Sequence, residues 1–210
     1  KLQLRGESRF LREILYDAYR EHGAKKLGIS LMQILIDMVH LNGEYDHAIA
    51  MIDELFAGLT INQILASKDS CHLYIRKIHH QMFFRPVKPL IQALLDIEPI
   101  LAKKDWSKEY NELLFMLGGN LGVLSGDLSF SRKWLVKAIR FAEQHKQPNY
   151  YIRAVRKYVD VLKSKGHLKW AKTFCLKGID IAEKYDYKRY HAILVVTLAD
   201  LYRMENNEVQ

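Results

Sequence analysis

Apolar residues recur along most of the chain at spacings of three and four, as expected for helices that bury one face. The stripe is clearest in three segments, which begin at Tyr45, Leu128 and Leu168, each two residues after a glycine. No segment alternates apolar and polar residues over the length of a strand, and only 4 Pro and 11 Gly interrupt the chain. The pattern predicts an all-α protein with helices over residues 7–22, 28–41, 45–58, 70–83, 87–103, 108–124, 128–144, 149–164, 168–184 and 189–204.

A turn recurs along the chain at a nearly constant spacing. Gly126 and Gly166 occupy matching positions, and one further step of the same length leads to Asn206. Gly43 lies about two such steps before Gly126, and residues 83–86 lie near the midpoint. Gly and Asn suit the left-handed backbone that ends a helix. The spacing predicts repeated helix pairs of about 40 residues, which must stack because a single pair cannot bury both of its faces.

Small residues recur close to these turns, where they let neighbouring helices approach each other: Ala48, Gly119, Ser131, Ala138, Ala171 and Ala199. Together with the large apolar residues around them, they resemble the signature of the tetratricopeptide repeat family over about residues 28–210. The resemblance implies a right-handed α-solenoid of antiparallel helix hairpins. HEAT-like or other helical repeats are the alternative, because the period exceeds the usual tetratricopeptide length and the signature Trp and closing Pro are mostly absent.

The longer repeat unit is also similar to the sensor domains of bacterial transcription regulators. The similarity lies in the sequences of residues 138–146 and 178–185 and involves no specific motif. In such regulators a DNA-binding domain lies outside the repeats, and none is recognisable in this sequence. The chain begins without Met and stops just after the last predicted turn. We therefore expect residues 1–210 to form a single repeat domain that is a fragment of a longer protein.

The family resemblance also implies where a ligand would bind. The first helix of every tetratricopeptide pair lines the inner, concave face, and counting back from each turn gives Gln33, Asp37, Asn120, Arg153, Arg156, Asp160, Lys163, Asp200 and Arg203. The Asn120 carboxamide can both donate to and accept from the backbone of an extended peptide, or it can satisfy a neighbouring helix. Arg153 and Arg156 can grip a carboxylate or phosphate, or they can belong to a solvated helix face.

The formal net charge of +8 is concentrated in the last two-fifths of the chain. Residues 131–210 hold 17 Lys and Arg against 8 Asp and Glu, whereas residues 1–130 hold 15 against 16. Such a surface suits nucleic acid, an acidic peptide or an acidic partner domain. Aromatic residues lie among the basic ones, as a nucleic-acid surface requires, but several of them are needed to pack between helices.

Other classes of site find little support in the sequence. Cys71 shares a predicted helix with His72, His79 and His80, but the spacing does not fit a helical zinc site. Cys71 and Cys175 are far apart in the sequence and are expected to be buried, reduced thiols. No phosphate-binding loop or nucleophile elbow is present, and the glycines at 118 and 119 fall inside a predicted helix. We expect no catalytic residue, no cofactor and no bound metal.

The expected function is recognition of a peptide or protein segment in the concave groove, as the ligand-sensing part of a bacterial transcription regulator. No apolar run reaches the roughly 20 residues that cross a bilayer, so we expect a cytoplasmic protein without membrane contact. DNA would be contacted only through a domain outside this chain. The alternatives are a constitutive scaffold or homo-oligomerisation module built on helix 189–204, and direct nucleic-acid binding through the basic repeats.

Overall fold

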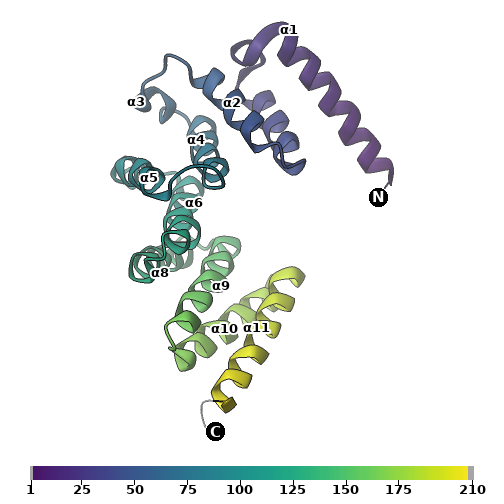
Figure 1. The fold of residues 1–210 in the computed structure, drawn as a ribbon. Helices are drawn as coiled ribbons and strands as arrows, with labels where there is room; N and C mark the ends of the chain where they lie inside the picture. The colour runs from purple at the N-terminus through teal and green to yellow at the C-terminus, as the bar shows by residue number, and fades with distance from the viewer. Residues whose placement is uncertain (1, 208–210) are drawn as a thin grey trace. The chain divides into compact units, whose positions relative to one another are not determined.

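The computed structural model describes residues 2–207, and within that range it contains helices and turns but no strand (Figure 1). The elements are α1 (Leu2–Leu41), α2 (Tyr45–Phe56), α3 (Ile61–Ile64), α4 (Lys68–Gln81), α5 (Val87–Leu101), α6 (Ser107–Phe115), η1 (Met116–Leu121), α7 (Gly122–Leu124), α8 (Leu128–Gln144), α9 (Pro148–Ser164), α10 (Leu168–Lys184) and α11 (Lys188–Asn207).

Contacts between these elements divide the chain into two compact units, Lys1–Pro86 and Val87–Gln210. The first unit contains α1–α4 and the second contains α5–α11. The expectation of one repeat domain over residues 1–210 remains a prediction.

Helix α1 is interrupted at two glycines, close to where the sequence predicts a break. Gly23 and Gly28 have φ angles of 75° and 74°, which lie outside the helical region. Glu54 of α2 holds the first break in place, because its carboxylate accepts hydrogen bonds from the Ala24 backbone N–H at 3.0 Å and the Tyr19 hydroxyl at 2.6 Å. The predicted gap between residues 22 and 28 is therefore correct.

The core of the first unit lies where α1, α2 and α4 pack together. Its fully buried apolar residues follow the three-and-four spacing of each helix and include Met32, Leu35, Ile36, Met51, Ile52 and Leu73. Helix α3, which was not predicted from the sequence, is a single turn that begins with a capping box between Thr60 and Gln63.

In the second unit, α8, α9, α10 and α11 pack in chain order, each against the next. Positive φ angles mark the turn before α8, at Gly126 (74°), and each of the three turns that follow, at Lys146 (52°), Gly166 (72°) and Asp186 (53°). The predicted ranges 128–144 and 168–184 agree with the structure. The predicted turn at Asn206 is wrong, because α11 continues through Asn207 and Asn206 has no break in its helix.

The two glycines inside the predicted helix 108–124 lie in a wide π-helical turn, η1, between α6 and α7. A Cβ on Gly118 would lie 2.7 Å from the Leu135 backbone nitrogen in α8. The buried Ser131 donates a hydrogen bond to the Gly118 carbonyl across the same contact. Gly118 therefore serves the close approach of two helices, as the sequence predicts.

Candidate ligand-binding face

The predicted ligand-facing residues fall in both units. Gln33 and Asp37 belong to α1, and the remaining seven lie in η1, α9 and α11 of the second unit. Asp37 is ion-paired with Arg76 of α4, so its carboxylate ties two helices of the first unit together. Gln33 is half-buried. Most of the candidate face therefore lies in the second unit, where α9 contacts α6 and η1 as well as α11.

Helix α9 presents two opposite faces because a helix turns about 100° per residue. Its buried residues, among them Val155 and Val159, pack against neighbouring helices. Arg153, Arg156 and Asp160 fall together on the polar side, as the sequence predicts. We call the polar side of α9, with the adjoining residues of α6, η1 and α11, the A face.

Arg153 is engaged within the protein. Its guanidinium donates two hydrogen bonds to the Glu112 carboxylate in α6, at 2.8 and 3.1 Å, and lies 4.5 Å from the centroid of the Phe115 ring. Burial acts to lower the pKa of Arg153, but the hydrogen bonds to Glu112 outweigh it and raise the pKa above its ordinary value. Arg153 is thus a link between α6 and α9, and its fork is not open to a ligand carboxylate.

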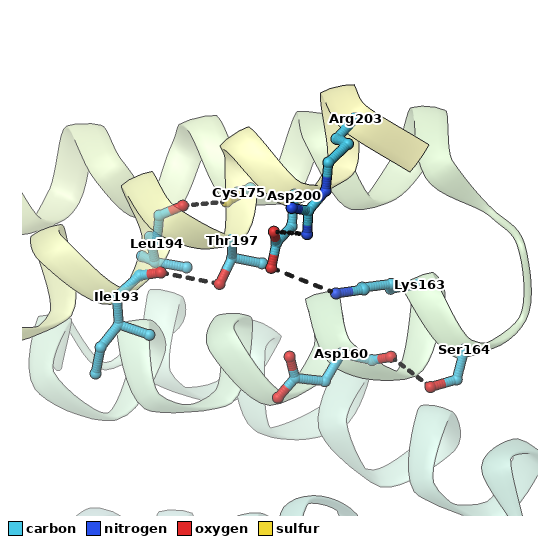
Figure 2. A network of polar contacts seen from close by, with 9 residues as sticks. All are labelled: Asp160, Lys163, Ser164, Cys175, Ile193, Leu194, Thr197, Asp200 and Arg203. Atoms are coloured by element: carbon cyan, nitrogen blue, oxygen red, sulfur yellow. Dashed lines mark hydrogen bonds and ion pairs between the residues drawn. The ribbon is translucent and has the colours of Figure 1, made fainter. Parts of the chain in front are cut away.

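A second link joins α9 to α11 (Figure 2). The Lys163 ammonium lies 3.9 Å from the Asp200 carboxylate, which also accepts a hydrogen bond from Arg203 at 2.7 Å. Ion pairs therefore connect successive helices of the A face on both sides of α9.

Three predicted residues of the A face keep ligand-binding capacity. Arg156 is half-buried and makes no ion pair or side-chain hydrogen bond among residues 10–206. Asn120 donates only to the Met116 sulfur, 3.0 Å away in its own helix. A thioether is a weak acceptor, so the carboxamide is not satisfied by a neighbouring helix. The Asp160 carboxylate is exposed, and Figure 2 shows it with no dashed contact.

Cys175 lies close to this network but has a structural role (Figure 2). Burial raises the pKa of its thiol to about 11, with a smaller contribution from the charge of Asp160. The sulfur donates a hydrogen bond to the Leu194 carbonyl at 3.1 Å. A buried thiol held neutral in this way is a poor nucleophile. Both cysteines are buried and neither forms a disulfide, as predicted.

Metal sites and membrane spans can be assessed over the part of the chain that the structure describes. Within it, no three His, Cys, Asp or Glu side chains come together in a group able to hold a metal ion. The same range contains no helix with the length and hydropathy that crossing a membrane requires.

The contact between Arg153 and Glu112 was not predicted from the sequence. The signal was present, because Glu112 and Arg153 are separated by close to one repeat length and carry opposite charges. Charged positions one repeat apart on the inner helices are expected to be neighbours in a stacked array.

Comparison with known proteins shows a likeness of fold. The sequence matches no protein-family model, and it matches no curated protein. Among solved structures it is similar to a signal transduction ATPase with numerous domains (STAND) that has a tetratricopeptide repeat sensor, from Pyrococcus horikoshii. The match has a TM-score of 0.68 and 9% sequence identity, and it covers 96% of this chain and 33% of that chain. The chain therefore has a tetratricopeptide-like helical fold.

Proposed function

We propose that this chain is a non-catalytic repeat module that binds a peptide or protein segment on the A face. The observation that supports this most is the contrast between the fixed and the unengaged polar groups of that face. Glu112 with Arg153 and Lys163 with Asp200 hold neighbouring helices in place, whereas Arg156 and Asn120 have no strong partner among residues 10–206. Polar groups held on a rigid framework bind at a lower entropic cost than mobile ones.

The proposed ligand is an extended segment with a carboxylate. Arg156 would take the carboxylate, and the Asn120 carboxamide would pair with the backbone of the segment, since it can donate and accept at once. We place the module in the cytoplasm, as a right-handed solenoid that senses a ligand for a bacterial transcription regulator. The repeat sensor of the similar STAND protein supports a sensing role.

A peptide-display selection followed by anisotropy titration tests the binding proposal. Arg156→Ala and Asn120→Ala are each expected to weaken selected peptides by about tenfold, the effect of losing a charged or buried hydrogen bond. Arg85→Ala, which removes an exposed arginine from the first unit, is the matched control and should leave the affinity unchanged. If both variants are folded and bind the peptides with unchanged affinity, the A face is not the binding site.

A sensor must also transmit the binding signal to the rest of the protein. The ligand must therefore change the arrangement of the helices. A saturating selected peptide is expected to change the small-angle scattering profile of the chain. Identical profiles with and without the peptide would leave a binding module but no sensor. A helix-turn-helix domain in the full-length protein would support the regulator assignment.

One observation favours a second candidate, a scaffold or homo-oligomerisation module. Val196 and Tyr202 of α11 are 64% and 48% exposed, and Val195 is also exposed, so the helix carries apolar side chains on its open surface. Light scattering distinguishes the two, since a scaffold of this kind would self-associate and Val196→Glu would make it monomeric.

A further inference from the structure

The side of α9 opposite the A face forms the floor of a groove between α8 and α10. Tyr151, Tyr158 and Leu162 of α9 line it, and its volume is about 600 Å³. These residues lie about half a turn away from Arg153 and Arg156 around the helix, so the groove is separate from the A face. We call it the α8–α10 groove.

The groove combines an apolar surface with unneutralised positive charge. Trp170 and Phe174 of α10 line one wall, and Trp170 is 64% exposed. Arg132 and Arg140 of α8 line the other wall and make no ion pair or side-chain hydrogen bond among residues 10–206. The one carboxylate among the lining residues is Glu143. The walls therefore attract a group that is both anionic and apolar.

The preceding repeat shows how such a groove can be filled. There, Glu98 of α5 accepts hydrogen bonds from Tyr110 of α6 and, at 2.7 Å, from Lys137 of α8. Although burial acts to raise the pKa of Glu98, the hydrogen bonds from Lys137 and Tyr110 lower it below its usual value. The carboxylate is therefore charged, and it neutralises the lysine. This repeat supplies its own anion.

The α8–α10 groove has the equivalent lysine and tyrosine but no equivalent carboxylate. Lys177 lies one repeat after Lys137. Each ammonium lies close to an aromatic ring: that of Lys177 is 5.8 Å from the centroid of the Phe174 ring, and that of Lys137 is 5.1 Å from the centroid of the Trp134 ring. Tyr151 corresponds to Tyr110. The two tyrosines are one residue further apart in sequence than the two lysines, because the π-helical turn η1 holds an extra residue.

The residue that stands in place of the carboxylate carries no charge. The same step along the chain that separates Glu98 from Lys137 leads back from Lys177 to the buried Ala138. Neither the Tyr151 hydroxyl nor the Lys177 ammonium has a hydrogen-bond partner among residues 10–206.

We propose that the α8–α10 groove binds an acidic peptide segment, whose carboxylate takes the place that Glu98 fills in the preceding repeat. Lys177 and Tyr151 hold the carboxylate, and Arg140 adds a second cation. A bulky apolar side chain of the segment packs against Trp170 and Phe174. A carboxylate is favoured over a nucleic-acid phosphate because the chain itself places a carboxylate against the equivalent tyrosine and lysine. This site is additional to the A face and does not depend on it.

The experiment uses the full chain and a fluorescent peptide array in which net charge and the central residue vary independently. Acidic peptides with a central Leu, Phe or Trp are expected to bind and to change the fluorescence of Trp170. Failure of every acidic peptide to bind, or preference for neutral or basic ones, overturns the proposal. So does an oligothymidylate that binds the groove more tightly than the best peptide at equal salt, because a phosphate ligand would then fit better.

Variants locate the binding. Lys177→Glu and Arg140→Glu should each weaken the best peptide by at least about tenfold, and Trp170→Ala should remove the preference for a bulky central residue. All three positions are exposed, so folding is expected to survive and is checked by circular dichroism. Lys108→Glu in α6 is the charge-matched control.

The outcomes also separate this site from the A face. If Arg156→Ala abolishes the binding of acidic peptides and Lys177→Glu does not, the groove assignment is overturned and the A face is supported. The reverse pattern supports the groove and leaves the A face without its ligand.

Discussion

His80 lies at the centre of an aromatic cluster in the first unit. Its side chain is fully buried, it stacks on His40 with ring centroids 4.7 Å apart, and both of its ring nitrogens lack a hydrogen-bond partner within the described residues. Burial, together with smaller contributions from the nearby charges of His40, His79 and Arg76, lowers the pKa of His80 to about 3. The imidazole is therefore neutral in the folded protein at ordinary pH.

Acid should destabilise the first unit through this residue. An unfolded histidine has a pKa of about 6.5, so between pH 6.5 and 3 the unfolded chain binds the proton and the folded one does not. The stability is present above pH 6.5 and is lost by up to about 1.4 kcal/mol per pH unit as the pH falls toward 3. His80→Phe, which keeps a ring for stacking, should flatten this dependence.

Urea unfolding followed by circular dichroism at several pH values measures the slope. His22→Phe is the control, because His22 is exposed and should leave the slope unchanged. An equal slope in wild type and His80→Phe would show that the proton is taken up elsewhere.

Gly118 is a position where even the Cβ atom of an alanine would disturb the packing of two helices. An alanine there would place its Cβ 2.7 Å from the Leu135 backbone nitrogen, so α8 would have to move. We expect Gly118→Ala to lower the free energy of unfolding by about 1–3 kcal/mol, the usual cost of overpacking. Gly119→Ala is the matched control, since its Cβ meets only the movable Phe115 ring, at 3.0 Å. Thermal unfolding compares the two, and equal losses would contradict the argument.

At the scale of the elements, the half-buried pair of Arg153 and Glu112 joins α6 to α9. Arg153→Ala leaves the Glu112 carboxylate without its partner, so we expect a loss of about 2–4 kcal/mol in the free energy of unfolding. The double variant Arg153→Met with Glu112→Leu should recover much of that loss, because no charge is left uncompensated. Lys163→Ala, at a more exposed and longer pair, should cost less than about 1 kcal/mol.

Urea titration of the two single variants and the double variant checks this ordering. A loss at Lys163 as large as the loss at Arg153 would mean that both links contribute equally to the spacing of the helices.

The helices could be predicted from the sequence because their signals are local. Gly126 and Gly166 mark the ends of elements by backbone conformation alone, and the bounds of α8 and α10 follow. Lys146 and Asp186 make equivalent left-handed turns, but their side chains give no such signal. Asn206 misled the prediction because Asn is tolerated within a helix as well as at its end.

The candidate sites were harder to predict because they depend on which helices meet. Helical periodicity predicts that Arg156 shares a face of α9 with Arg153 and Asp160, but it does not show what that face contacts. The engagement of Arg153 was missed, since Glu112 is distant in sequence. The α8–α10 groove was missed entirely, because Tyr158 and Phe174 have the spacing of core residues and give no sign that a groove stays open between them.

At the scale of the whole molecule, the division after Pro86 makes the second unit a candidate for independent study. Residues 87–210, expressed alone, should give a helical circular dichroism spectrum and a cooperative thermal transition, because the packing of α5–α11 is internal to that unit. The acidic peptides expected to bind the full chain should bind it with similar affinity. An unfolded product would show that the two units are stable only together.

The wide turn at Met116–Leu121 affects the spacing of the repeats. A π-helical turn accommodates one more residue than the α-helix around it, so it absorbs a single-residue insertion while the flanking segments keep their faces. The step from Tyr110 to Tyr151 is accordingly longer, by that single insertion, than the step from Gly126 to Gly166. The wide turn therefore lets α6 and α9 keep their buried faces although the step between them is one residue longer than the step between the two glycine turns.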